Sequence, residues 1–234
     1  MTRAATRPAG TVIADGAVAL VGAGPAGAGP LAACLSRADV VVAADGGAAA
    51  ALAAGRTPDA VIGDLDSLPP GCALPPGRIH RVAGQYDTDF EKCMDRIEAP
   101  IVLGAGFLGG RADHALAALG ALVRGRSSRG RPWPPAILVG GEDVVFAVPP
   151  RIELPLAPGC RVSLFPMAPL SARSEGLEWP LDGLALAPSG RVATSNRATG
   201  PVWIAPDAPG LLCLLPADRL DVVIRALAPG AASG

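Results

Sequence analysis

The stretch VIGDLDSL, residues 61–68, joins an apolar run to two carboxylates spaced two residues apart. The apolar residues predict a buried strand over residues 60–63, which ends where the acidic residues begin. In extended backbone, side chains two residues apart point the same way, about 6.5–7 Å from one another, so Asp64 and Asp66 would face one point. Two like charges so placed are costly unless a cation lies between them, and Mg²⁺ takes oxygen ligands. The stretch therefore predicts a magnesium site at the end of a strand, with a solvated turn as the alternative.

Apolar runs of the same kind recur through the first half of the chain, and helix-like segments lie between them. We expect strands over residues 18–21, 40–44, 60–63, 79–82 and 101–103, and helices over residues 31–36, 47–54, 89–97 and 112–124. This alternation is typical of a parallel sheet with helices on its faces. The expected fold class is α/β, with a Rossmann-like parallel-sheet domain at the N-terminus.

The character of the sequence changes after RGRSSRGRPWPP, residues 124–135, which predicts a surface loop. Short β-prone segments separated by Pro and Gly turns follow it, and we expect strands over residues 136–139, 143–148, 151–154, 161–165, 184–187, 202–204 and 211–215. A helical pattern returns only at residues 217–228. The sequence predicts a C-terminal all-β sandwich or barrel, with an α/β domain over residues 1–140 and a β domain over residues 141–234.

Composition narrows the function classes. The formal net charge is −1 and only 3% of residues are aromatic, which disfavours a nucleic-acid-binding surface. No apolar run reaches about 18 residues, so we expect no membrane span, and residues 1–10 lack the apolar core of a signal peptide. The five cysteines are scattered and odd in number: Cys34, Cys72, Cys93, Cys160 and Cys213. Free thiols in the reducing cytoplasm fit this pattern best.

Acidic and glycine-rich segments follow several of the expected parallel strands. Ligands bind outside the carboxyl ends of such strands, so these segments should gather at one edge of the sheet. They are Asp45-Gly46-Gly47, Asp64-Leu65-Asp66-Ser67, residues 85–89 (QYDTD) and residues 106–111 (GFLGGR). Their convergence is stronger evidence for a site than any single motif.

The segment TDFEKCM, residues 88–94, has the form of a capping box, with Thr88 as the N-cap and Glu91 three residues later. Asp89 and Lys92 then share one helix face. Lys92 is the only lysine in a chain with 20 basic residues, so it is a candidate for chemistry that arginine cannot copy. A well-capped helix with a surface ion pair is the alternative.

The segment GAGFLGGRADH, residues 104–114, predicts a strand, a glycine-rich loop and the start of a helix. Gly109 and Gly110 allow close backbone approach, and Arg111 can clamp a phosphate. His114 has either a ligand role or a packing role.

The segment ALVGAGPAGAGP, residues 19–30, contains G-x-G-x-x-G at Gly22, Gly24 and Gly27. That motif raises the alternative of a flavin or nicotinamide oxidoreductase. The helix expected after it is very short, and Pro25 and Pro30 interrupt the loop. We interpret the stretch as a glycine-rich loop lining the cleft and not as a dinucleotide fingerprint.

Together these motifs resemble the thiamine pyrophosphokinase family. The resemblance rests on ADGGA (44–48), PDAVIGDLDS (58–67), QYDTDFEKC (85–93), GGRADHALAAL (109–119), VSLFPM (162–167), GLEWPL (176–181) and TSN (194–196). It implies transfer of a pyrophosphoryl group from ATP to the hydroxyl of thiamine, giving thiamine diphosphate and AMP, by a homodimer with its active site between subunits. A non-catalytic nucleotide-binding regulator on the same fold is a further alternative.

The resemblance also implies roles for individual residues. Mg²⁺ would be held by Asp64, Asp66 and Asp89, which with Lys92 would form the catalytic set. The nucleotide would be bound by Asp45, Gly46, Gln85, Thr88, Gly109, Gly110, Arg111 and His114. Thiamine would be bound by Trp179, Ser195 and Asn196, with the indole face suited to the cationic thiazolium. Tyr86 stands where the family usually has an acidic residue, and the acid comes one place later, as Asp87.

Overall fold

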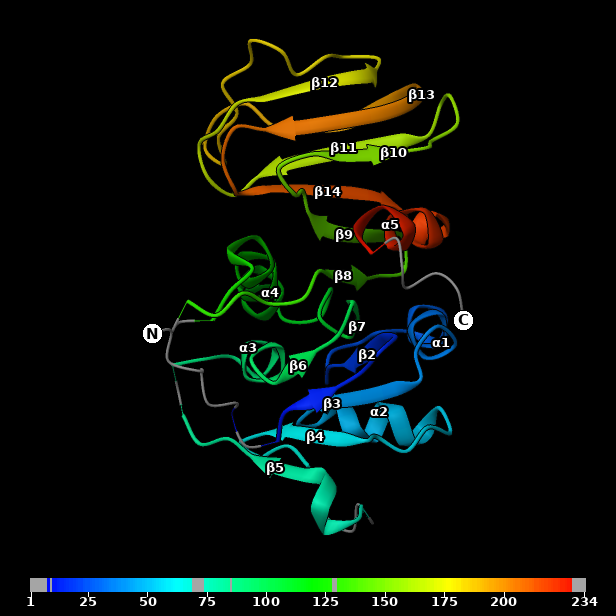
Figure 1. The fold of residues 1–234 in the computed structure, drawn as a ribbon, viewed down its shortest axis with the longest axis vertical. Coiled ribbons are helices and arrows are strands. Elements are labelled where there is room, and N and C mark those ends of the chain that lie inside the picture. Colours follow the sequence, from blue (N-terminus) through cyan, green and yellow to red (C-terminus); the bar gives the residue numbers. More distant parts are fainter. Residues whose placement is uncertain (1–7, 9, 69–73, 85, 128–129, 229–234) are drawn as a thin grey trace.

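One mixed sheet runs through the computed structural model, which describes residues 8, 10–68, 74–84, 86–127 and 130–228. Within these residues the sheet has twelve strands, in the order β10-β13-β11-β14-β9-β8-β7-β2-β3-β4-β5, with β12 paired to β13. Figure 1 shows the parallel strands in the lower part of the molecule and the antiparallel strands above them. The predicted α/β class is therefore present, built on a single large mixed sheet.

The parallel strands form because their apolar runs can be buried on both faces. They are β2 (Ala17–Val21), β3 (Val40–Ala44), β4 (Ala60–Gly63), β5 (Ile79–Arg81), β7 (Ile101–Ala105) and β8 (Ala136–Val139). Neighbouring members of this set pair in parallel. Their carboxyl ends consequently open at one edge of the sheet, as the sequence predicted.

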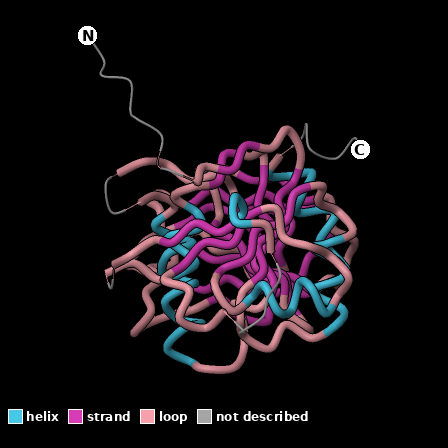
Figure 2. The backbone as a smooth tube through the Cα atoms, turned by 90° about the horizontal axis from the view of Figure 1, so that it is seen from below, coloured by secondary structure: helices cyan, strands magenta, loops and turns pink. Residues whose placement is uncertain are grey.

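Helices cover both faces of the sheet. One apolar core contains side chains of α1 (Ala28–Leu35), α2 (Gly47–Ala53) and α5 (Leu220–Leu227). A second core contains side chains of α3 (Asp89–Met94) and α4 (Ala112–Arg124). Successive residues of β2 alternate between the two cores, because strand side chains alternate between faces. Figure 2 shows the strands at the centre with the helices outside them.

The sheet continues across the predicted domain boundary. β8 pairs antiparallel with β9 (Asp143–Ala147), so residues 140 and 141 lie in the turn between two hydrogen-bonded strands. The remaining strands are β10 (Ile152–Leu154), β11 (Arg161–Pro166), β12 (Ala172–Leu177), β13 (Ala193–Pro206) and β14 (Leu211–Pro216). One apolar core holds residues from both parts of the chain. The division into two domains remains a prediction.

Strand β13 joins two ladders in the antiparallel part. Its first half pairs with β11, its second half pairs with β10, and β12 pairs with it on the other side. Two short elements, β1 (Val12–Ile13) and β6 (Ile97–Glu98), pair in parallel as a separate small sheet. Single 3₁₀ turns span Pro76–Arg78 and Ala217–Arg219. In the described part of the chain, no helix is long and apolar enough to cross a membrane.

Two predicted elements need correction, and one strand was missed. The strand predicted at residues 184–187 is absent, and Leu186 makes only isolated bridges to Leu170 and Arg191. Strand β12 was not predicted, because its exposed side alternates with small buried residues and carries charge. The helix predicted over residues 89–97 ends at Met94, because Ile97 is used in β6.

Candidate active site at the carboxyl edge of the parallel strands

A cleft of about 680 Å³ lies at the carboxyl ends of the parallel strands. The loops that follow β2, β3, β4, β5 and β7 line it, together with the first turns of α3 and α4. All of its lining residues in the described part of the chain fall between positions 22 and 118. The edge predicted from the positions of the acidic and glycine segments is therefore the location of the cleft.

Asp45 lies at the base of the cleft in a constrained position. Its φ of 44° is in the left-handed region, which is uncommon for a residue with a side chain and often marks a functional site. The residue is 4% exposed. A Cβ added at Gly63 would come within 2.8 Å of the Asp45 Cβ, so only glycine at the end of β4 admits this close approach.

The Asp45 carboxylate is only half satisfied. Oδ2 accepts a hydrogen bond from the Ser67 backbone N–H at 3.1 Å, whereas Oδ1 is buried without a partner. Burial raises the pKa of the Asp45 carboxyl, the Ser67 N–H partly opposes that rise, and the charges of Asp89 and Asp64 add to it. A buried carboxylate oxygen without a donor is the observation expected of a cation ligand.

Asp64 and Asp66 do not face one point as the extended geometry predicted. Leu65, between them, has a φ of 69°, so the backbone turns instead of continuing the strand. The Asp66 N–H donates to Asp64 Oδ1 at 3.3 Å, and the Asp66 side chain is exposed. This backbone hydrogen bond, helped by the charge of Lys92, lowers the pKa of the Asp64 carboxyl.

Helix α3 carries two further side chains of the site, Asp89 and Lys92. Its predicted capping box is confirmed: Thr88 Oγ1 accepts from the Glu91 N–H, and the Glu91 carboxylate accepts from the Thr88 N–H. The Lys92 ammonium donates to Asp89 at 2.9 Å and to Asp64 at 3.4 Å, and the Lys92 side chain is 5% exposed. Burial alone would lower the Lys92 pKa, but the hydrogen bond and charge of Asp89, with the charge of Asp64, raise it overall. Lys92 is therefore a buried cation.

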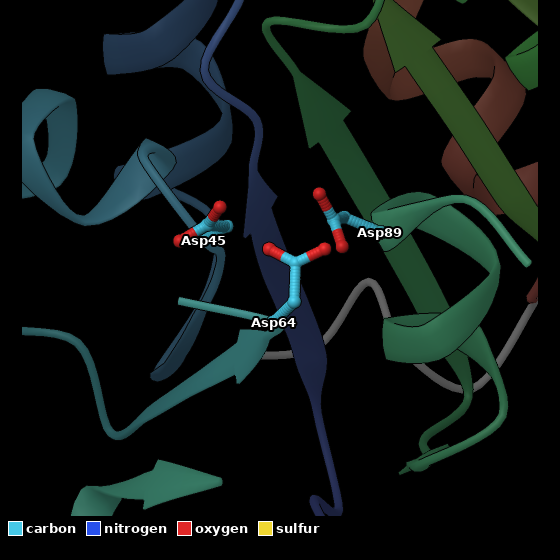
Figure 3. Close-up of side chains that lie close together, drawn as sticks. All are labelled: Asp45, Asp64 and Asp89. Carbon is cyan, nitrogen blue, oxygen red and sulfur yellow. The ribbon is translucent and has the colours of Figure 1, made fainter. Parts of the chain in front are cut away.

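Asp45, Asp64 and Asp89 form an acidic trio whose side chains converge from three elements (Figure 3). One carboxylate oxygen from each lies within 4.8 Å of the others. Three carboxylates, one with an unpartnered buried oxygen, fit the oxygen-ligand preference of Mg²⁺. The sequence analysis assigned Asp45 to nucleotide binding and assigned Asp66, with Asp64 and Asp89, to the metal. In the structure, the trio contains Asp45 in place of Asp66.

The glycines of the first loop serve backbone packing. A Cβ at Gly24 would lie 2.5 Å from the Gly106 carbonyl oxygen, and a Cβ at Gly106 would lie 2.5 Å from the Gly22 carbonyl oxygen. The loops after β2 and β7 therefore touch backbone to backbone, and the Gly24 N–H donates to Gly106 O at 3.1 Å. This contact accounts for Gly22 and Gly24 but not for Gly27, and residues 22–25 of the stretch line the cleft.

The remaining predicted nucleotide residues lie around the cleft. Gly46, Thr88, Gly109, Gly110, Arg111 and His114 all line it. Arg111 is exposed at the N-cap of α4 and pairs with Asp113 at 2.6 Å, and His114 is also exposed. Gln85 lies outside the described residues. Tyr86 lines the cleft and is fully exposed.

The predicted thiamine residues lie together in the antiparallel part of the chain and do not line the cleft. The Asn196 side chain is buried; its Nδ2 donates to Trp179 O at 2.7 Å, and its Oδ1 accepts from Trp179 N at 3.2 Å. Trp179 is 53% exposed, which excludes a core role for the indole. Ser195 is exposed, with a φ of 59°, and its N–H donates to Ser163 Oγ at 3.0 Å.

Phe107 is a cleft residue that the sequence analysis missed. Its ring lines the cleft and meets Phe90 of α3 edge-on, with ring centroids 5.0 Å apart. The available signal was an aromatic residue inside a glycine-rich loop after a parallel strand. Phe107 gives the cleft that contains the acidic trio an apolar side chain in its lining.

A parallel sheet with a carboxylate trio and a buried lysine at its carboxyl edge is the arrangement expected of an α/β enzyme, because ligands bind outside the carboxyl ends of parallel strands. Residues 31–131 match the family described as "Thiamin pyrophosphokinase, catalytic domain". The match is to the same family that the sequence motifs resembled, and it covers residues 31–131 of the chain. No curated protein sequence matches the chain significantly.

Solved structures share the fold over most of the chain. Thiamin pyrophosphokinase from Candida albicans superposes with a TM-score of 0.70 at 15% identity, covering 89% of this chain and 94% of that one. The yeast enzyme gives 0.69 at 19% identity, covering 88% of each chain. Thiamine pyrophosphokinase from Bacillus subtilis gives 0.67 at 19% identity, covering 86% of this chain and 98% of that one. At these identities the likeness establishes a common fold.

Proposed function

We propose that this chain transfers a pyrophosphoryl group from ATP to the hydroxyl of thiamine. The hydroxyl oxygen bonds to the β-phosphorus, and the bond between that phosphorus and the oxygen bridging to the α-phosphorus breaks. The products are thiamine diphosphate and AMP, and the hydroxyl proton is released. The single observation that best supports this proposal is the acidic trio, with its unpartnered Asp45 oxygen, beside Lys92 in the cleft of a thiamin pyrophosphokinase catalytic domain.

Magnesium is the proposed cofactor. Asp45, Asp64 and Asp89 would hold it, and Asp66 is proposed as a further ligand because the family resemblance assigns it that role. When bound, the ion neutralises charge on the phosphate oxygens and orients them. The three carboxylates make this edge of the sheet anionic. Lys92 pairs with Asp64 and Asp89 inside the cleft and neutralises part of their charge.

The chain's own donors would align the triphosphate. Lys92 offers ammonium protons at the base of the cleft, and Arg111 offers a guanidinium at its rim. Gly109 and Gly110 have positive φ and expose backbone, so an anionic group can approach closely. Phosphoryl transfer depends mainly on such alignment and on charge neutralisation, and the cleft combines both.

Thiamine binding is proposed for the group of Trp179, Ser195 and Asn196. The exposed indole of Trp179 suits the flat, cationic thiazolium. Because the lining of the cleft in the described part of the chain ends at Ala118, we propose that a second copy of the chain brings its Trp179 to the cleft in a homodimer. We also propose a cytoplasmic location, supported by the free thiols of Cys34, Cys93, Cys160 and Cys213.

Incubation with ATP, Mg²⁺ and thiamine tests the proposal, with AMP and thiamine diphosphate measured together. Asp64→Asn is the matched variant, because it removes one charge of the trio and nearly keeps its shape. Equal amounts of both products from the wild type, and little from the variant, support the function. Binding of ATP without any turnover would instead favour the nucleotide-binding regulator.

A further inference from the structure

Helix α3 is short, yet it carries two residues of the proposed active site. Its six residues include Asp89 and Lys92, which both line the cleft. Isolated helices shorter than about 12 residues are marginal in water, so tertiary contacts must hold this one. The positions of Asp89 and Lys92 therefore depend on whatever fixes α3 to the rest of the molecule.

Glu91 fixes the start of α3 to the end of α4. Its Oε2 accepts hydrogen bonds from the Thr88 N–H at 2.7 Å and from the Thr88 hydroxyl at 2.8 Å. Its Oε1 accepts from the guanidinium of Arg124, the last residue of α4. The Glu91 side chain is 12% exposed and the Arg124 side chain is 42% exposed, so the carboxylate end of this ion pair is shielded from solvent and the guanidinium end is partly open to it. One carboxylate thus caps α3 and bridges two helices.

The segment after α4 holds the other end of α3. Trp133 Nε1 donates to Oδ1 of Asp95, the C-cap of α3, at 2.6 Å. The Trp133 ring meets Phe90 edge-on at 6.3 Å, and the Arg124 guanidinium carbon lies 5.5 Å from the centre of the Trp133 ring. Arg124 therefore contacts both Glu91 at the start of α3 and the indole that holds its end.

We propose that the Glu91–Arg124 ion pair positions α3 for pyrophosphoryl transfer, with Trp133 as its support. Among the described residues that line the cleft, neither Glu91 nor Arg124 is present, so the pair acts through α3 and is not itself catalytic. It ties α3, which supplies Asp89 and Lys92, to α4, whose first turn supplies His114 to the same cleft. This inference rests on the proposed function.

The chain contains a matched control for this ion pair. Arg37, just after α1, donates to both oxygens of Asp221 in α5, at 2.6 and 2.9 Å. This pair also joins two helices, but it lies on the face of the sheet opposite α3 and α4. Arg37→Ala therefore removes a comparable interhelical pair without touching α3.

The test compares Arg124→Ala, Glu91→Gln, the double variant and Arg37→Ala in the full chain. We expect Arg124→Ala to lower kcat at least tenfold while the KM for each substrate changes less than threefold. Glutamine can still serve the capping box, so Glu91→Gln should lose activity mainly through the lost ion pair. The double variant should then fall within about threefold of Arg124→Ala, because both changes break one interaction. Arg37→Ala should keep kcat within twofold.

Calorimetric titration of each protein with Mg²⁺ gives a readout that does not depend on turnover. We expect Arg124→Ala to weaken Mg²⁺ binding at least threefold and Arg37→Ala to leave it unchanged. Normal kcat and Mg²⁺ binding in Arg124→Ala would overturn the inference, and so would equal losses in Arg37→Ala. If the wild type makes no thiamine diphosphate, the proposed function fails, and the Mg²⁺ titration still decides whether the pair positions α3.

Discussion

The ammonium nitrogen of Lys92 lies 2.9 Å from Oδ1 of Asp89, one helical turn earlier on α3. The same nitrogen lies 3.4 Å from Asp64 Oδ2, so one buried cation bridges a helix and the end of a strand. Removing both carboxylates would leave the Lys92 ammonium, which is 5% exposed, without a compensating charge, and an unpaired buried charge is destabilising. The same cation lines the cleft that we propose binds the triphosphate of ATP.

Lys92 should not be replaceable by arginine. The guanidinium is planar and larger than the ammonium, and the Lys92 side chain is 5% exposed. We therefore expect that an arginine in this space cannot pair with both Asp64 Oδ2 and Asp89 Oδ1. We expect Lys92→Arg and Lys92→Met to lower turnover at least about a hundredfold, several kcal/mol being plausible for lost charge stabilisation. The measurement is kcat at saturating ATP, thiamine and Mg²⁺. Turnover of Lys92→Arg within threefold of wild type would contradict this role.

Asp45→Asn should separate stability from activity. Because the Asp45 pKa is raised, its protonated form is favoured in the folded state, and the stability it contributes at low pH is lost as pH rises through that raised pKa. At neutral pH without Mg²⁺, we therefore expect the variant to unfold at the same or a higher temperature than wild type. Turnover should fall at least about a hundredfold, since one anionic ligand is gone.

Thermal unfolding with and without Mg²⁺ measures this effect. Wild type should gain stability on addition of Mg²⁺, and Asp45→Asn should gain much less. A variant that unfolds more easily without Mg²⁺ yet keeps normal turnover would show that Asp45 is a structural residue and not a ligand.

Asp66→Asn tests the proposed ligand outside the trio. We expect turnover at limiting Mg²⁺ to fall at least about a hundredfold, since the change removes an anionic ligand while nearly keeping its shape. The fold should survive, because the Asp66 side chain is exposed. Near-normal turnover would instead restrict the ligand set to Asp45, Asp64 and Asp89.

Trp179→Ala should impair thiamine binding with little cost in stability. The indole is 53% exposed, so its removal leaves no core cavity. Cation–π attraction of roughly 0.5–2 kcal/mol and lost stacking area should raise the KM for thiamine tenfold or more. The KM for ATP should change little. A stable variant with an unchanged thiamine KM would exclude Trp179 from the site.

The sequence predicted the strands and caps that depend on local physics. Residues 40–44 and 60–63 are strands as expected, because continuous apolar runs are buried on both faces. The capping box at Thr88 was also predictable, because it uses two side chains three residues apart. Strand β12 was not, because an alternating segment with exposed Arg173 and Glu175 gains its order from pairing with β13.

The acidic edge was predictable, but its detailed ligand geometry was not. Parallel topology alone brings Asp45, Asp64 and Asp89 to one edge, as expected. Asp45 and Leu65 both have left-handed backbone; aspartate adopts it more often than most residues, but nothing in the local sequence marks Leu65 for it. The φ of Asp45 directs its side chain toward Asp64 and Asp89, and the φ of Leu65 separates Asp66 from Asp64. Tertiary contacts set these backbone angles, so residue spacing alone could not predict the ligand geometry.

The products formed from ATP and thiamine test the central claim most directly. The full chain is incubated with ATP, Mg²⁺ and thiamine, and AMP, ADP and the thiamine phosphates are separated and measured over time, with and without a chelator. The account predicts AMP and thiamine diphosphate in equal amounts, with both abolished by the chelator. Formation of ADP with thiamine monophosphate, or undiminished turnover in the presence of the chelator, would contradict it.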